Sequence, residues 1–191
     1  MESLNTLQER YQWNVYEKIE EGETFAWTKF KDTDASNVNH IYFLENTLKP
    51  GRSYKVSVIG MIHGRADGYS ELDFYVNIPP RGGSCFVDKS EGYSDKTSFL
   101  FECKEWADED LPLSYEFMYY TRYGVVFLLY DDISPVFVTK LPLGDVEKNF
   151  TLNLQVKVID AHGTYNTTKI DVQVCKQEID CPKKKGFAIK S

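Results

Sequence analysis

Pro79-Pro80-Arg81-Gly82-Gly83-Ser84-Cys85 is the stretch that decides how this chain is divided. A proline lacks an amide donor and a glycine permits positive φ, so this run ends the strand patterns that precede it. We therefore expect a domain junction here, with a first module over residues 1–79 and a second module over residues 80–175. A C-terminal segment, residues 176–191, follows and carries Cys181 and a run of lysines.

Beyond the junction, seven short segments have the β-branched and aromatic composition that is typical of strands. They are residues 84–87, 97–104, 113–120, 125–130, 135–141, 150–160 and 165–174. The sixth segment alternates apolar and polar residues from Leu152 to Val158, which predicts one packed and one solvated face. Seven short strands separated by turns indicate an immunoglobulin-like β-sandwich.

Ahead of the junction, strand patterns are fewer. They cover residues 11–16, 23–30, 41–44, 54–61 and 71–76. The Pro50-Gly51 turn that leads to Tyr54 resembles the start of the sixth strand in fibronectin type III-like sandwiches, where a tyrosine hydroxyl anchors a corner. A full seven-stranded sandwich would need two more strands before Tyr11, so this module is truncated or has irregular early strands. The fold class expected for the chain is all-β, with two tandem immunoglobulin-like (fibronectin type III-like) β-sandwich modules.

Composition narrows the possible functions. The chain has 191 residues, 42% of them hydrophobic and 15% aromatic, which is enough to build cores. Its 29 acidic and 22 basic residues give a formal net charge of -7, so nucleic acid is not an expected partner. No run approaches the roughly 20 apolar residues of a membrane span. The first residues lack a secretory signal, and we interpret the chain as a fragment of a longer protein.

A second run carries a family resemblance. After Cys85 and one strand-like segment comes Cys103-Lys104-Glu105-Trp106-Ala107-Asp108-Glu109-Asp110-Leu111-Pro112-Leu113-Ser114-Tyr115. Together with the proline and glycine run, it resembles the receptor-for-egg-jelly (REJ) region of the polycystin-1 family, which are large receptors of cilia and sperm membranes. The resemblance covers almost the whole second module and the approach to it from Leu48, whereas residues 1–40 carry little that is recognisable.

The resemblance implies a place and a role. It implies a non-enzymatic extracellular fragment of a ciliary or cell-surface receptor, on the outer side of the plasma or ciliary membrane. Such a module would be structural or mechanical and would contact ligands or matrix. Its partners would be other domains of the parent receptor, extracellular matrix or glycans, and the parent could associate with a polycystin-2-type channel. No cofactor is implied.

Cysteines and glycosylation triplets bear on the same location. Four cysteines, Cys85, Cys103, Cys175 and Cys181, allow three pairings if all are oxidised, and our first choice joins Cys85 to Cys103 and Cys175 to Cys181. Four buried free thiols in a cytosolic protein are the alternative. Two acceptor triplets, which begin at Asn149 and Asn166, favour an extracellular protein.

Catalytic patterns are weak, and the acidic turn offers an alternative function. His40, His63 and His162 lie in different predicted turns or strand edges, without the Gly-x-Ser-x-Gly motif of a hydrolase, so we expect no enzyme. Calcium prefers carboxylate ligands, and four acids after Cys103 are dense enough to supply several: Glu105, Asp108, Glu109 and Asp110, with Asp131 and Asp132 as further candidates. Asp108 and Asp110 are therefore candidate ligands of a calcium-dependent adhesion module, although such a run is more often a solvated turn.

Aromatic residues suggest one partner surface. Tyr119 and Tyr120 belong to a predicted strand in which successive aromatic side chains point to opposite faces of the sheet. The side chain of Arg122, just after them, is available for stacking. These three residues form our candidate partner surface, with core packing as the plainer interpretation. Trp106 could stack on a ligand, but its place three residues after Cys103 favours a role in covering the disulfide and the core.

Overall fold

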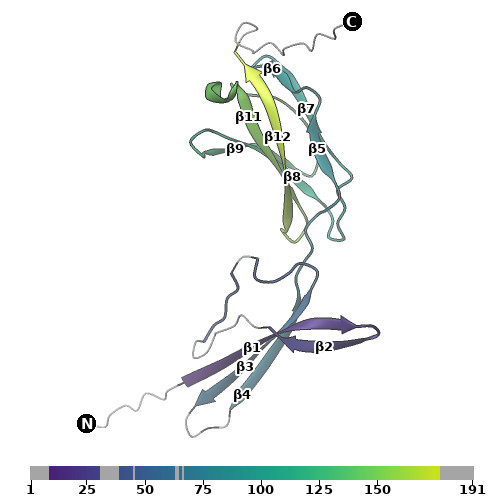
Figure 1. Cartoon of the computed structure of the whole chain (residues 1–191), viewed down its shortest axis with the longest axis vertical. Coiled ribbons are helices and arrows are strands. Elements are labelled where there is room, and N and C mark those ends of the chain that lie inside the picture. Colours follow the sequence, from purple (N-terminus) through teal and green to yellow (C-terminus); the bar gives the residue numbers. More distant parts are fainter. Residues whose placement is uncertain (1–8, 31–38, 45, 63–64, 66, 177–191) are drawn as a thin grey trace, which may run out of the picture. The chain divides into compact units, whose positions relative to one another are not determined.

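We describe the protein from a computed structural model, in which residues 9–30, 39–44, 46–62, 65 and 67–176 are described. The chain forms two compact units, Met1–Ile78 and Pro79–Ser191, and both are built from strands (Figure 1). The boundary between the units lies between Ile78 and Pro79, one residue before the junction that we placed between Pro79 and Pro80. Within the described residues we find no helical segment with the length and hydropathy of a membrane span.

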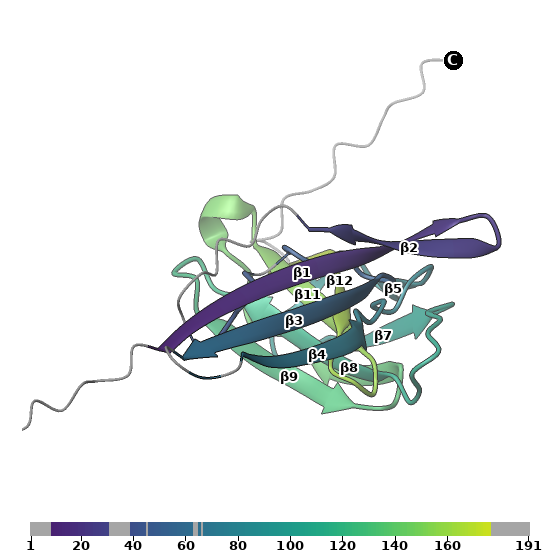
Figure 2. The same cartoon turned by 90° about the horizontal axis from the view of Figure 1, so that it is seen from below.

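The described part of the first unit is one antiparallel sheet. Its strands are β1 (Glu9–Glu21), β2 (Thr24–Lys29), β3 (Ser53–Ile62) and β4 (Gly68–Tyr75). The order across the sheet is β2-β1-β3-β4, and Figure 2 shows β1, β3 and β4 side by side. Two hairpins, β1 with β2 and β3 with β4, are thus joined through β1 and β3.

One face of this sheet is apolar. Residues directly opposite each other on paired strands share a face, and Val56 of β3 lies between Val15 of β1 and Leu72 of β4. The preceding residue, Lys55, points to the other face and forms ion pairs with Glu71 and Asp73. On the apolar face, three buried hydrophobic residues form a small core, with partly buried neighbours around them: Trp13, Phe30, Ile41, Phe43, Leu48, Phe74 and Val76.

Tyr54 anchors the corner that leads into β3. Its ring is fully buried, stacks on Phe74 with ring centroids 6.0 Å apart and meets the ring of Phe30 edge-on at 5.7 Å. Its hydroxyl accepts a hydrogen bond from the backbone amide of Lys49 at 3.0 Å. Gly51 turns the intervening backbone with a φ of 75°, a conformation that favours glycine. This is the tyrosine corner that the Pro50-Gly51 turn suggested.

The second unit contains two sheets. Its elements are β5 (Ser84–Val87), β6 (Glu91–Tyr93), β7 (Ser98–Lys104), β8 (Ser114–Tyr120), β9 (Val126–Asp132), β10 (Val136–Lys140), a 3-10 turn η1 (Val146–Lys148), β11 (Thr151–Ile159) and β12 (Tyr165–Cys175). One sheet has the order β10-β7-β5 and the other has the order β6-β12-β11-β8-β9.

The core of the second unit contains residues of both sheets. Alternate residues of β11, from Leu152 to Val158, are buried, as the sequence pattern predicted. They join buried residues of β7, β8 and β12, such as Phe101, Phe117 and Val172, in one cluster. Two sheets with a shared apolar core, antiparallel except where β6 pairs with β12, form a sandwich of the immunoglobulin type, which confirms the predicted all-β fold class.

Two strand predictions need correction. The sequence missed β6, whose three residues pair in parallel with the end of β12 and have no alternation of their own. It also predicted a strand at residues 41–44, but these residues pair with no strand in the described part of the chain. Their alternation is nevertheless visible in burial, because Ile41 and Phe43 are partly buried whereas Tyr42 and Leu44 are exposed.

Candidate functional sites in the second unit

The cysteine motif forms a compact covalent link. Cys85 of β5 and Cys103 of β7 lie directly opposite each other and form a disulfide, as the sequence predicted. Just outside this pair, the backbones of Arg81 and Ala107 exchange two hydrogen bonds of 3.0 Å. The proline and glycine run and the second cysteine run therefore lie side by side.

Trp106 packs against the core of the second unit and lies over Gly83. A Cβ atom on Gly83 would lie 2.2 Å from the nearest atom of the indole ring, so only glycine fits beneath Trp106. The predicted covering role of Trp106 agrees with this packing. The indole Nε1 is buried without a hydrogen-bond partner among the described residues.

The second predicted cystine is only partly described. Cys175 ends β12, is fully buried and is not a free thiol. Its predicted partner, Cys181, lies outside the described residues, as does most of the C-terminal segment 176–191.

An aromatic groove of about 750 Å³ lies where β8 and β9 meet the loop before β11. Three of its lining residues, Tyr119, Tyr120 and Arg122, are those that we predicted as a partner surface. The loop between β10 and β11 adds residues that the sequence analysis did not single out, among them Leu143 and Val146. No local pattern links this loop to β8, because the two come together only through the pairing of β8 with β11.

The predicted surface residues have different roles in the aromatic groove. Tyr119 stacks on Phe127 with ring centroids 5.0 Å apart and 10° between the ring planes, and it also packs against the core. Tyr120 points to the other face of the sheet, where its hydroxyl donates a hydrogen bond to Gln155. Arg122 forms an ion pair with Glu147 at 3.4 Å. Tyr119 is therefore structural, whereas Tyr120 and Arg122 are accessible.

Exposed apolar side chains surround the aromatic groove. Tyr123 is 76% exposed and Val146 60%, although each offers a large apolar surface. The guanidinium of Arg122 lies over the ring of Tyr123, 4.7 Å from its centroid, and donates a hydrogen bond to its hydroxyl. That contact raises the pKa of Arg122, whose guanidinium is in any case charged at physiological pH. The groove thus combines aromatic area with two basic residues, Arg122 and Lys148, and one acidic residue, Asp145.

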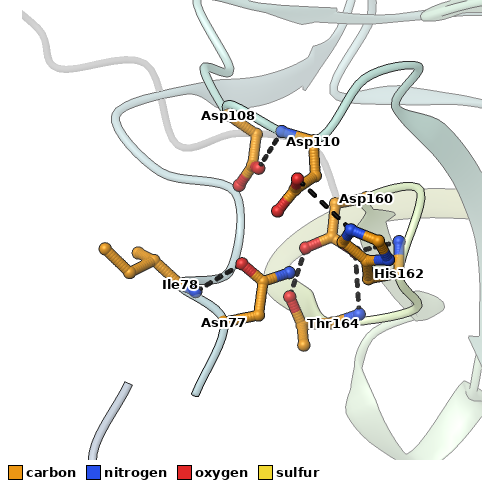
Figure 3. Close-up of polar contacts among 7 residues, drawn as sticks. All are labelled: Asn77, Ile78, Asp108, Asp110, Asp160, His162 and Thr164. Carbon is orange, nitrogen blue, oxygen red and sulfur yellow. Dashed lines mark hydrogen bonds and ion pairs between the residues drawn. The ribbon is translucent and has the colours of Figure 1, made fainter. Parts of the chain in front are cut away.

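The acidic turn forms a cluster with a residue from another part of the chain. Carboxylate oxygens of Asp108, Asp110 and Asp160 lie within 4.8 Å of one another (Figure 3). Asp160 follows β11, and sequence reasoning missed it because some 50 residues separate it from Asp110. The other predicted contributors, Glu105, Glu109, Asp131 and Asp132, are not part of this cluster within the described residues.

Hydrogen bonds already hold the three carboxylates in place. Asp108 accepts the backbone amide of Asp110 at 2.8 Å, and Asp110 lies 3.4 Å from the ring of His162 (Figure 3). Asp160 is buried and accepts hydrogen bonds from the backbone amides of His162 and Thr164 and from the Thr164 hydroxyl. Burial raises the pKa of Asp160, but these hydrogen bonds outweigh it, so its pKa lies below the ordinary value. Asp160 is therefore ionised at neutral pH.

The two glycosylation triplets lie on the surface. Asn149 ends η1 in a left-handed conformation and Asn166 lies near the start of β12, and both residues are exposed. Of the histidines, His40 belongs to the first unit and His162 to the second. His63 lies outside the described residues.

Comparison with known proteins places the chain among REJ domains. The REJ domain family matches residues 2–182. The polycystin family receptor for egg jelly of Mus musculus is 30% identical over 113 residues, which cover 52% of this chain and 5% of that protein. The chain therefore spans only a small part of this relative. The crystal structure of the chicken CNTN1 FN1-FN3 domains matches 85% of this chain and 56% of that one, at 13% identity and a TM-score of 0.37, too low to support an argument.

The strand arrangement defines the class of protein first: this is an all-β chain with immunoglobulin-like architecture. The family match, which covers nearly the whole sequence, then gives the identity. The chain belongs to the REJ domain family.

Proposed function

We propose that this chain is a non-enzymatic, extracellular module of a polycystin-type receptor, and that it contacts a protein, matrix or glycan ligand through the aromatic groove. Its family membership supports a receptor context. The exposed triplets at Asn149 and Asn166 and the disulfide support an extracellular location. The plasma or ciliary membrane is the location that we propose. Association of the parent protein with a polycystin-2-type channel is part of the same proposal.

The observation that carries the ligand-contacting role is the exposed aromatic surface beside Arg122. Large rigid side chains and arginine supply much of the binding free energy in protein interfaces, because they bury area at low entropic cost. Tyr123 and Phe127 provide such area, with exposed fractions of 76% and 46%. Arg122 adds a charge that can pair with an acidic ligand or stack on a sugar or aromatic ring.

Binding measurements with a double variant test the aromatic groove. Arg122→Ala/Tyr123→Ala removes exposed groove atoms and spares the core, whereas Tyr119→Ala would also break packing against Phe127. The probes are purified collagen, laminin and fibronectin together with a glycan array. Tyr165→Ala is the matched control, because Tyr165 is 50% exposed in the same unit but does not line the groove.

We expect the double variant to weaken the binding of at least one probe by tenfold or more, which corresponds to about 1.4 kcal/mol. The control should bind as the wild type does. Equal losses in the double variant and the control, or no binding of any probe by the wild type, would count against the aromatic groove as a ligand site.

A calcium-dependent adhesion module is the second candidate function. The observation that favours it is the convergence of Asp160 on Asp108 and Asp110. Calcium binds oxygen at about 2.3–2.6 Å, so oxygens that share one ion lie within about 5 Å of one another. The three carboxylates meet this condition and come from two separate turns, so a bound ion would tie the turns together.

Thermal unfolding with added calcium tests this candidate. A site with millimolar affinity should raise Tm by several degrees at 10 mM calcium, and magnesium at equal concentration should do less. Asp108→Asn/Asp110→Asn should abolish the increase, while the asparagine at position 108 can still accept the amide of residue 110. An unchanged Tm in calcium would remove the candidate and leave the turns as the hydrogen-bonded structures described above.

A further inference from the structure

The two units share one strand order. The sheet β2-β1-β3-β4 of the first unit and the strands β9-β8-β11-β12 of the second are each two antiparallel hairpins joined through their first strands. By this correspondence β1 matches β8, and β3 matches β11. The second unit adds the sheet β10-β7-β5 across its core, and the described part of the first unit has no counterpart of that sheet.

One remnant of the second sheet is nevertheless present in the first unit. Residues 41–44 lie between the two hairpins in sequence, as β10 does in the second unit. The burial of both segments alternates from residue to residue. Their aromatic contacts differ, because Phe43 lies against Phe74 of β4, the counterpart of β12, at 6.3 Å between ring centroids, whereas Phe137 of β10 lies against Phe117 of β8 at 5.4 Å. Residues 41–44 therefore correspond to β10 in chain order and in burial pattern.

Residues 41–44 and β10 differ in their strand pairing. β10 pairs with β7 along its whole length, whereas residues 41–44 pair with no strand in the described part of the first unit. An extended segment without a ladder partner presents backbone donors and acceptors to any added strand.

The apolar face beside this segment is also incompletely covered. Leu72 shares the face of Val15 and Val56, yet it is 66% exposed. The buried core comprises three hydrophobic residues in the first unit and fourteen in the second, within the described residues. An exposed leucine on the core-facing side of a sheet marks area that a second layer would bury.

We propose that the first unit is an acceptor for two β-strands that come ahead of β1 in the parent protein, one of which pairs with residues 41–44. The order of the second unit identifies this occupant. β5 and β7 both precede β8, the counterpart of β1, and β7 is the strand that pairs with β10. The mouse relative is far longer than this chain, which covers 5% of it. The added strands carry alternating apolar residues that cover Leu72.

Hydrogen exchange on two forms of the protein tests the proposal. One form is the 191-residue chain, and the other is the same chain extended N-terminally by the roughly 30 residues that precede it in the parent sequence, the span that β5 to β8 occupies in the second unit. Pairing predicts that exchange of the amides at residues 41–44 slows by at least about tenfold in the extended form. Amides of β12 in the second unit are the internal control and should not change.

Substitution at Leu72 gives a second readout. Leu72→Arg should lower Tm by at least about 5 °C in the extended chain, where the side chain is covered, and by much less in the 191-residue chain. Tyr69→Arg is the matched control, because Tyr69 is 64% exposed on the opposite face, and it should be mild in both chains.

Two outcomes would overturn the proposal. Equal exchange at residues 41–44 in both forms, with equal effects of Leu72→Arg, would mean that the preceding residues do not complete the sheet. Protection in the 191-residue chain that grows with protein concentration, together with a dimer in light scattering, would identify a second copy of the chain as the occupant instead.

Discussion

The hydroxyl of Tyr54 accepts the backbone amide of Lys49 at 3.0 Å while its ring is fully buried between Phe30 and Phe74. One side chain therefore both fills the small core of the first unit and fixes the chain direction at the start of β3. Because this core has few buried members, the contribution of this contact is a large share of what holds the unit together.

Removing the Tyr54 hydroxyl should destabilise the first unit without changing its packing. Tyr54→Phe keeps the ring but leaves the Lys49 amide without its acceptor, so we expect a loss of about 1–2 kcal/mol in the free energy of unfolding. Urea unfolding, followed by fluorescence and by exchange of β3 amides, measures this loss. Tyr42→Phe is the control, because Tyr42 is 76% exposed, and equal stability of both variants would contradict the role of the corner.

Gly83 should not tolerate a side chain. In Gly83→Ala the new methyl group would lie 2.2 Å from the Trp106 ring, so the indole must move away from the core. We expect a loss of about 1–3 kcal/mol in the second unit and a changed near-ultraviolet circular dichroism signal. In Gly60→Ala the nearest contact is 3.7 Å, so that variant should lose little, and a stable Gly83→Ala protein would show that Trp106 is free to move.

The Cys85–Cys103 disulfide should stabilise the second unit chiefly by restricting the unfolded chain. It closes a loop with a sequence separation of 18, for which the chain-entropy estimate is about 3 kcal/mol. Cys85→Ala/Cys103→Ala should therefore reduce the free energy of unfolding by about 3 kcal/mol, measured as a lower midpoint in urea, and should leave the strand order intact. A midpoint equal to that of the wild type would mean that the link adds strain that offsets its entropic benefit.

Asp160 should make the second unit sensitive to acid. Its folded pKa lies below the ordinary value because hydrogen bonds from Thr164 and His162 outweigh its burial. A depressed carboxyl pKa contributes stability above the unfolded pKa of about 3.9, and this contribution is lost as the pH falls through the folded pKa.

Unfolding measured from pH 7 to pH 2 in the wild type and in Asp160→Asn tests this sign. The variant should be about 1–3 kcal/mol less stable at pH 7 and should converge with the wild type in acid. A constant difference across the whole pH range would mean that the charge of Asp160 contributes nothing.

Local sequence patterns predicted the strands that alternate clearly. The buried residues of β11 follow a period of two. The Pro50-Gly51 turn before Tyr54 is a residue pattern typical of a tyrosine corner, whose hydrogen bond the structure contains. Both signals lie within ten residues of sequence, so no knowledge of the tertiary structure was needed to find them.

Features that depend on distant pairing were missed or mispredicted. β6 has three residues and exists as a strand because it pairs with the end of β12, some 80 residues later. Residues 41–44 have the alternation of a strand but lack a partner strand in the described chain. Asp160 reaches Asp110 only because β8 and β11 are neighbours in the same sheet. Periodicity reports which face a residue points to, but it does not report what lies across from it.

The covalent link between β5 and β7 also limits how far the second unit can lengthen under tension. A force applied at Pro79 is transmitted from Cys85 to Cys103 through the disulfide. The residues between these two cysteines, which include β6, are therefore not extended by the force. An extended chain spans at most about 3.3–3.6 Å per residue. With a sequence separation of 18, the disulfide therefore shortens the fully extended second unit by roughly 60 Å. The second unit therefore has a shorter maximum length when this disulfide is oxidised than when it is reduced.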